Sequence, residues 1–371
     1  MVARSTRPRV LCLSGYDAAS HRHWRELLAQ GLPEFEWHTV ALPPRHFRWR
    51  IRGNPLSWLD EPLMQESWDL LLVTSMVDLA PLRGLFPHLA RTPAVAYFHE
   101  NQFAYPERRP RKASNEPRVV NLYTALSADW ILFNSDWNRE SFLRGVHQLL
   151  QQMPDRKPQS VARRIRDKSR ILPVPVPDAA YTGDDRCWPE VPHLLWNHRW
   201  EYDKGPDCLL ALLRGLRDRG RKFRLSLVGE QFRASPEEFE LIRKEFADSL
   251  VHEGFIETRD DYDALLNQAD IVVSTALHDF QGLAILEAMA AGCVPVVPDR
   301  LAYPEYVPEE LRYPSREDDP HQEGQGAAEL IDGLLDQPPL SVATFSPEDY
   351  RASRLLPLYR GMVFEAMDSG R

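Results

Sequence analysis

Short apolar runs alternate with helix-forming stretches along the chain, and this alternation limits the fold more than any other feature. In the first half, the apolar runs lie at Arg9–Ser14, Trp37–Leu42, Asp69–Thr74, Ala94–Phe98 and Trp130–Phe133, with helical stretches such as His23–Gln30 and Arg118–Ala128 between them. A helix between two strands carries the chain back across the sheet, so the strands pair in parallel. The first half is therefore predicted to form a doubly wound α/β unit.

The second half repeats this pattern. Its strands and helices are expected at Leu194–Asn197, Pro206–Arg217, Phe223–Val228, Pro236–Asp248, Val251–Phe255, Tyr262–Gln268 and Ile271–Ser274. At 371 residues the chain is too long for one core, so two Rossmann-like domains are predicted, at residues 1–178 and 179–345. Alternating prolines in Ile171–Asp178 exclude a central strand or a helix interior at the boundary. In the tail of residues 346–371, a last helix at Glu348–Met367 is expected to pack back on the first domain.

Composition excludes several classes of protein. Hydrophobic residues make up 43% of the chain and charged residues 27%, as in soluble globular proteins. No apolar run approaches the roughly 20 residues that a membrane span needs, and Met1–Arg7 lacks the core of a signal peptide. We therefore expect a cytoplasmic protein with no membrane partner. The four cysteines (Cys12, Cys187, Cys208 and Cys293) have no metal-ligand spacing, so neither a disulfide framework nor a zinc site is predicted.

Charge is divided unevenly between the two halves. Residues 1–185 carry 25 Lys and Arg against 20 Asp and Glu, a balance of +5, whereas residues 186–371 carry 20 against 34, a balance of −14. Only the first half suits a polyanionic partner. Within it, Arg45–Arg52 interleaves arginines with aromatic residues and Arg108–Lys112 is a second basic cluster. Arginine pairs with phosphate and aromatic rings stack on unpaired bases, but either cluster alone is equally consistent with an ordinary solvated surface.

The segment Thr275–Val297 sets two carboxylates around the start of a predicted helix. Good helix formers run from Leu283 to Ala291, Gly292 stands where a C-terminal cap is expected, and a β-branched run follows. Asp279 then lies on the preceding loop, and Glu287 sits one to two turns inside the helix.

The start of this helix is a predicted anion site. The backbone N–H groups at Gly282 and Leu283 and the positive end of the helix dipole would hold a diphosphate. Asp279 would then meet a sugar while Glu287 meets a ribose diol. The ordinary alternative is an N-terminal cap aspartate and a solvated glutamate.

Two further polar loops follow apolar strands. His99–Tyr105 comes after Ala94–Phe98, and His198–Gly205 comes after Leu194–Asn197. In the second loop, Arg199 can bind a pyrophosphate bidentately and Lys204 can act as a mobile point charge. Each residue alone is usually structural or on the surface. Because all three sets follow strand ends, where ligands of such sheets bind, together they favour a diphosphate-sugar site in a cleft between the two domains.

No metal is predicted in this site. Asp261 and Asp263 form a superficially metal-binding pair, but they lie where a helix begins and are better explained as N-terminal capping. No other cofactor is indicated.

At these residues the second half resembles the donor domain of the retaining family-4 glycosyltransferases of the GT-B fold. The whole chain is similar, more narrowly, to the tRNA-queuosine α-mannosyltransferases. The matching stretches cover most of residues 10–300 and are Ser20-His21 with Trp24, Leu42-Pro43 with Arg48-Trp49-Arg50, residues 69–76 with Leu79, Tyr97–Gln102 with Tyr105-Pro106, Phe133–Ser135 with Glu140–Phe142, and Leu195–Glu201.

The resemblance implies transfer of mannose from GDP-mannose to the cyclopentene-diol of queuosine in a tRNA anticodon loop, with retained α configuration. Residues 1–178 would be the acceptor domain and residues 179–345 the donor domain. Arg199 and Lys204 would neutralise the diphosphate, Glu287 would hold the ribose, Asp279 would grip sugar hydroxyls and His99 would sit at the reacting centre. The acceptor side would be lined by Glu100, Asn101, Gln102, Arg48 and Arg50.

The chain departs from the wider family at two places, and alternatives stay open. Asp279 stands where glutamate is usual, and Ala18-Ala19 replaces tandem glycines in the first loop. The alternatives are a family-4 transferase with another sugar nucleotide or with a small glycan or lipid acceptor, and a noncatalytic nucleotide- or tRNA-binding module. A nicotinamide dehydrogenase is disfavoured because no G-x-G-x-x-G follows a strand. No protein partner is indicated.

Overall fold

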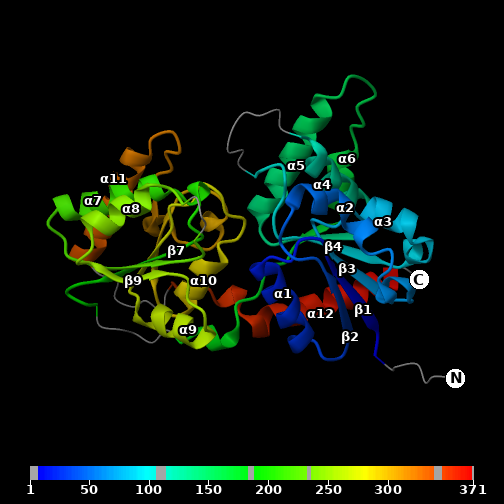
Figure 1. Ribbon diagram of the computed structural model, residues 1–371, viewed down its shortest axis with the longest axis horizontal. Helices are drawn as coiled ribbons and strands as arrows, with labels where there is room; N and C mark the ends of the chain where they lie inside the picture. The colour runs from blue at the N-terminus through cyan, green and yellow to red at the C-terminus, as the bar shows by residue number, and fades with distance from the viewer. Residues whose placement is uncertain (1–6, 106–113, 183–187, 232–234, 338–344, 370–371) are drawn as a thin grey trace. The chain divides into compact units, whose positions relative to one another are not determined.

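The computed structural model describes residues 7–105, 114–182, 188–231, 235–337 and 345–369, and the chain forms two compact units (Figure 1). The first unit runs to Pro175 and takes in the C-terminal segment from Ala352, and the second is Val176–Arg351. The boundaries expected from the sequence are residues 178 and 345. The basic cluster Arg108–Lys112 lies outside the described residues.

The first unit is built on a parallel sheet, six-stranded in the described part of the chain, in the order β2-β1-β3-β4-β5-β6. Its strands are β1 (Arg9–Ser14), β2 (Glu36–Ala41), β3 (Leu70–Thr74), β4 (Ala94–Phe98), β5 (Trp130–Phe133) and β6 (Ser169–Ile171). Its helices are α1 (Ala19–Gly31), α2 (Phe47–Ser57), α3 (Leu79–Leu85), α4 (Glu116–Ser127), α5 (Asp136–Gln151), α6 (Val161–Asp167) and α12 (Ala352–Ser369), with 3-10 helices η1 (Pro62–Gln65) and η2 (Pro87–Arg91). Figure 1 shows α1 and α12 on one face of this sheet and α2 to α5 on the other.

Burial on both faces explains the composition of the central strands. Every residue of β3 and β4 is buried, which is why both read as continuous apolar runs. On the face covered by α1, the Trp24 ring stacks on Tyr97 at 4.3 Å between centroids, and its Nε1 donates to Tyr359 Oη of α12 at 3.1 Å. This contact fixes the C-terminal helix to the first unit.

The second unit repeats the plan, with a described six-stranded parallel sheet in the order β12-β11-β10-β7-β8-β9. Its strands are β7 (His193–Asn197), β8 (Arg224–Val228), β9 (Leu250–Gly254), β10 (Ile271–Val273), β11 (Val294–Pro298) and β12 (Arg312–Tyr313). Its helices are α7 (Pro206–Asp218), α8 (Glu238–Glu245), α9 (Arg259–Gln268), α10 (Leu283–Ala290) and α11 (Pro320–Asp336), with 3-10 helices η3 (Asp178–Ala180), η4 (Tyr202–Lys204), η5 (Tyr303–Glu305), η6 (Glu309–Leu311) and η8 (Glu348–Tyr350). In Figure 1, α7, α8 and α11 cover one face and α9 and α10 the other.

Several elements differ from the sequence-based expectation. The basic stretch Arg45–Arg52, for which no helix is predicted, begins α2 at Phe47. The expected tail helix at residues 348–367 is the short η8 followed by α12, which starts at Ala352. Among the described cysteines, Cys12, Cys208 and Cys293 are buried and form no disulfide with one another, and Cys187 lies outside the described residues. None of the helices in the described ranges combines the length and hydropathy that a bilayer crossing requires.

Candidate active site

A glycine and an aspartate form the turn that precedes the N-terminus of α10. Gly282 adopts φ 75°, and a Cβ there would lie 2.4 Å from Tyr306 Oη, so only glycine fits without strain. Asp279 Oδ1 accepts a hydrogen bond from the Gly282 N–H at 3.0 Å. The helix then starts at Leu283, where its first N–H groups have no partner within the helix. The predicted loop-to-helix geometry is present, but the Gly282 N–H, which is predicted to be open to a diphosphate, is paired with Asp279.

Lys204 lies beside this turn. It ends η4, which follows β7. The next residue, Gly205, has φ 63°, and a Cβ there would lie 2.1 Å from Thr275 O, so the position requires glycine. The Lys204 Nζ donates to His278 O at 2.5 Å and lies 4.0 Å from Asp279 Oδ2. Burial alone would raise the pKa of Asp279, but Lys204, His198, His278 and the Gly282 N–H together outweigh burial and the pKa is lowered. The structure thus brings together Lys204 and Asp279, which the sequence places in separate loops.

Arg199 lies on the loop between β7 and η4. Its side chain is 47% exposed, and its Nη2 is 3.1 Å from Glu201 Oε2. An exposed ion pair of this kind contributes little free energy, so an incoming phosphate can compete with Glu201 for the guanidinium.

A buried hydrogen-bonded network, not predicted from the sequence, supports the same edge of the sheet. His198 Nε2 bonds Ser274 Oγ at 3.0 Å, and Ser274 Oγ bonds Tyr303 Oη at 2.7 Å. Burial and the nearby charge of Lys204 lower the pKa of His198 to about 3, so this imidazole is neutral at pH 7. The network joins the ends of β7 and β10 without adding charge.

Glu287 is buried inside α10 and held on both carboxylate oxygens. Arg259 Nη1 donates to Oε1 at 2.8 Å, and Tyr262 Oη donates to Oε2 at 3.0 Å. Tyr262 Oη in turn accepts from Asn197 Nδ2 at 2.7 Å. Each oxygen keeps a second lone pair for a ligand hydroxyl. Arg259 and Tyr262 are not predictable as partners of Glu287 from the sequence, because they are far from it in the chain.

The start of α9 accounts for Asp261 and Asp263. The N-terminal cap is Thr258, whose Oγ1 accepts the Asp261 N–H at 3.1 Å, and Asp263 pairs with Arg259 at 2.9 Å. The Asp261 carboxylate accepts a hydrogen bond from the Thr258 hydroxyl at 2.6 Å, so both carboxylates are bonded within the first turns of α9, although the cap itself is Thr258 and not either aspartate. Over the ranges that the structure describes, no group of three or more His, Cys, Asp or Glu is arranged to hold a metal ion.

In the first unit, His99 follows β4 and is buried against His21. The two rings stack at 4.2 Å between centroids with 17° between planes. His21 Nε2 bonds Glu100 Oε2 at 3.0 Å, and Ser75 Oγ donates to Glu100 Oε1 at 3.3 Å. Burial would lower the pKa of His21, but Glu100 outweighs it and the pKa is raised; burial and His21 together hold the pKa of His99 well below its ordinary value. The predicted reacting-centre histidine is thus a neutral ring stacked on a histidine that is hydrogen-bonded to Glu100.

Asn101 and Gln102 take different positions on this loop. Asn101 is fully buried: its Nδ2 donates to Asn138 Oδ1 and Ser141 Oγ, each at 2.9 Å, and its Oδ1 accepts the N–H groups of Phe103 and Ala104. This amide shapes the loop. Gln102 is half-buried, with its Nε2 3.7 Å from Met76 Sδ, and its side chain is the better placed of the two to meet a ligand.

Arg48 and Arg50 lie on α2. Arg48 is exposed and Arg50 is half-buried. Their neighbour Arg52 is tied down, since its Nη1 donates to Asp78 Oδ2 at 2.9 Å. Arg48 is therefore the more accessible of the two predicted tRNA contacts.

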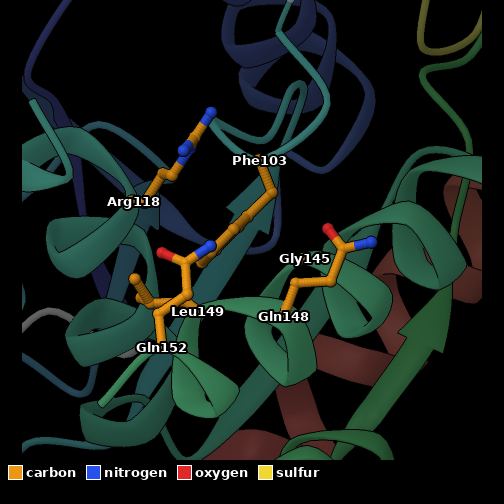
Figure 2. A pocket seen from close by; sticks show the side chains of 6 residues that line it. All are labelled: Phe103, Arg118, Gly145, Gln148, Leu149 and Gln152. Carbon is orange, nitrogen blue, oxygen red and sulfur yellow. The ribbon is translucent and has the colours of Figure 1, made fainter. Parts of the chain in front are cut away.

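A small pocket between α4 and α5 lies apart from the predicted site residues, none of which lines it. Figure 2 shows its lining residues, which are Phe103, Arg118, Gly145, Gln148, Leu149 and Gln152. A Cβ on Gly145 would lie 2.3 Å from Phe103 Cβ, so this glycine admits the aromatic ring. We assign the pocket no part in the site.

Comparison with known proteins identifies the family. Residues 9–176 match the family described as tRNA-queuosine alpha-mannosyltransferase N-terminal, and residues 190–339 match glycosyl transferases group 1. The chain is 34% identical over 320 residues to the tRNA-queuosine alpha-mannosyltransferase of Drosophila melanogaster. The aligned region covers 83% of this chain and 84% of the fly protein. The chain belongs to the tRNA-queuosine alpha-mannosyltransferase family.

The chain also has two more distant likenesses, of which the solved structure bears on the fold alone. A GDP-mannose:cellobiosyl-diphosphopolyprenol alpha-mannosyltransferase of Xanthomonas oryzae is 29% identical over 110 residues, which are 29% of this chain and 28% of that protein. The solved sucrose-phosphate synthase of Thermosynechococcus elongatus has a TM-score of 0.74 at 14% identity, covering 98% of this chain and 100% of the synthase. The predicted two-domain α/β fold of the GT-B type is confirmed, and the chain is a glycosyltransferase.

Proposed function

We propose that this glycosyltransferase moves mannose from GDP-mannose to the cyclopentene-diol of queuosine in a tRNA, with retention of the α configuration. The observation that carries the proposal is the similarity to the fly tRNA-queuosine alpha-mannosyltransferase over most of both chains. The choice of GDP-mannose is further supported by the Xanthomonas relative, whose name specifies that donor.

The second unit supplies the donor site in this proposal. Lys204 and the N–H group at Leu283 bind the diphosphate, and Arg199 exchanges its exposed pairing with Glu201 for a phosphate oxygen. Glu287, held by its two neighbours, accepts hydrogen bonds from the ribose hydroxyls. These groups neutralise the diphosphate charge, so the reaction is proposed to need no metal ion.

Asp279 and His99 are proposed to contact the transferred sugar. The pKa of Asp279 is lowered by Lys204 and its other neighbours, and its carboxylate, which accepts from Gly282 and lies 4.0 Å from Lys204, can accept a further hydrogen bond from a sugar hydroxyl. His99 is kept neutral and can donate or accept a single hydrogen bond to a sugar hydroxyl. On the acceptor side we propose Glu100 and Gln102, with Arg48 and Arg50 binding tRNA phosphates.

The proposed chemistry is a substitution on one face of the sugar. The bond from the anomeric carbon to the phosphate oxygen breaks, and a queuosine hydroxyl oxygen bonds to the same carbon from the same side. The hydroxyl proton passes to the departing phosphate oxygen, and GDP leaves. Cations and helix N–H groups aimed at the leaving oxygen stabilise the transition state more than the ground state, because the charge develops as the bond breaks.

The test compares matched tRNAs and donors. Purified protein is incubated with GDP-mannose and queuosine-containing tRNA, and both GDP release and sugar incorporation are measured, with and without EDTA. The same tRNA prepared without queuosine is the control. We expect mannose to be incorporated only into tRNA that contains queuosine, at a rate that EDTA does not change. We also expect α-mannosidase to remove the mannose from the modified tRNA. Incorporation that ignores queuosine, or a faster reaction with UDP-glucose, would overturn the assignment.

A further inference from the structure

Trp49 presents an unusual flat surface on α2. Its side chain is 57% exposed, the most exposed of the described tryptophans. A Cβ built on Gly53, one turn later, would meet three atoms of the Trp49 ring, Cε2 at 2.6 Å and Cδ2 and Cζ2 at 2.9 Å. Three ring atoms at nearly equal distances mean that one face of the indole lies flat over Gly53. The other face is directed away from the helix.

The helix around this ring carries positive charge. Residues 47–57 contain three arginines and no aspartate or glutamate. Arg48, next to the tryptophan, is exposed, and Arg52 extends the basic stretch although it is paired with Asp78. An exposed aromatic face among arginines suits a polyanion with unpaired bases, which bind such surfaces by stacking and by phosphate pairing.

Contacts at Met76 join α2 to the proposed acceptor loop. Ile51 of α2 packs against Met76, whose carbonyl oxygen accepts from Asn54 Nδ2 at 3.0 Å. The Met76 sulfur is 3.7 Å from Gln102 Nε2. The helix that carries Trp49 is thus in direct contact with the residue that contacts Gln102, so α2 and the proposed acceptor loop are neighbours in the first unit.

From these observations we infer that Trp49 is a stacking platform for one unpaired base of the tRNA loop that carries queuosine. Gly53 seats the ring by leaving room for its inner face, and Arg48 binds the adjoining backbone. The inference rests on the proposed tRNA acceptor and adds base stacking to the phosphate contacts. Because stacking is sequence-tolerant, it would strengthen binding without selecting a particular base.

Two substitutions at Trp49 and one at Gly53 test this. Equilibrium binding of queuosine-containing tRNA is measured at several salt concentrations for Trp49→Ala, Trp49→Phe and Gly53→Ala, together with thermal unfolding. Loss of one stacked base is expected to weaken binding by about 5- to 150-fold in Trp49→Ala. Trp49→Phe should lose less, because a smaller ring still stacks. The salt dependence should stay as in the wild type, whereas Arg48→Ala should reduce its slope by about 0.7 to 0.9.

Gly53→Ala separates a binding role from a folding role. The new methyl group displaces the indole, so tRNA binding should weaken, while the melting temperature should hold or rise because alanine favours the helix over glycine. Wild-type binding in Trp49→Ala, or a loss that flattens the salt dependence as Arg48→Ala does, would overturn the inference. Wild-type protein that binds tRNA through Trp49 but transfers no mannose would instead overturn the proposed function alone.

Discussion

Replacing Lys204 by methionine should remove most of the turnover while the fold is kept. The side chain is 9% exposed, and methionine keeps an unbranched apolar chain there while the ammonium group is lost. At the 4.0 Å that separates Nζ from Asp279 Oδ2, two unit charges attract by about 4 kcal/mol at an effective dielectric constant of about 20, before desolvation is subtracted. A diphosphate bound at the α10 N-terminus would meet the same ammonium group at comparable range.

The expected loss of kcat depends on how much more strongly the Lys204 ammonium group attracts the leaving phosphate oxygen in the transition state than in the ground state. Removing one fixed donor to a developing oxyanion typically costs about 10²- to 10³-fold in kcat, and we expect a loss in this range for Lys204→Met. The assay is initial-rate GDP release with queuosine-containing tRNA at saturating donor, with melting temperatures to show that the variant is folded. Lys222→Met, at an exposed lysine of the same unit, is the matched control. A folded Lys204→Met enzyme with kcat within about threefold of the wild type would refute this role, since such a ratio is far below one lost donor.

Three further predictions concern the acceptor helix, the histidine pair and the α10 turn. The double variant Arg48→Ala with Arg50→Ala should weaken tRNA binding and lower the slope of log affinity against log salt by up to about 1.8, as two lost phosphate contacts require; unchanged modification of tRNA at elevated salt would show that these arginines are only surface charges. Glu100 raises the pKa of His21 in the folded protein, so their pairing stabilises the fold fully below about pH 6.5 and this stabilisation is lost as the pH rises through the folded pKa. Glu100→Gln should therefore lower the melting temperature more at about pH 5.5 than at about pH 9. An equal loss at both pH values would contradict the ion pair. Gly282→Ala forces alanine into left-handed backbone and should lower the free energy of unfolding in urea by about 1 to 3 kcal/mol; wild-type stability would show that the turn can relax.

Local signals made the α10 turn predictable. Good helix formers from Leu283 onward and a glycine at residue 292 mark both ends of the helix, and Gly292 indeed has φ 95°. Asp279 therefore falls on the preceding loop and Glu287 inside the helix, as expected. The strands that end at the site are also predictable from local sequence, because they are buried on both faces and therefore appear as continuous apolar runs.

The side chains that bind the predicted site residues could not be identified from the sequence, because they come from distant parts of the chain. Arg259 and Tyr262 lie 28 and 25 positions before Glu287. His21 lies 79 positions before Glu100. Periodicity reports which face of an element is buried, but it carries no information on which distant side chain arrives there.

Two helices are difficult to identify from sequence, one because it lacks an apolar stripe and the other because it contains several glycines. In α2, arginines and Trp49 replace a clear apolar stripe, and Pro55 lies inside the helix. In α11, glycines lower the helical propensity, yet Gly324 is needed because a Cβ would lie 2.5 Å from Cys208 O of α7. Close packing of the two helices therefore overrides propensity, and only the folded structure shows this.

Mass spectrometry of nucleosides from queuosine-containing tRNA, after incubation with GDP-mannose, UDP-glucose or no donor, tests the central claim most directly. The account predicts a hexose mass increment on queuosine with GDP-mannose alone, and its loss in Lys204→Met. An increment on another nucleoside, an increment only with UDP-glucose, or none with any donor from an enzyme that binds both substrates would contradict it.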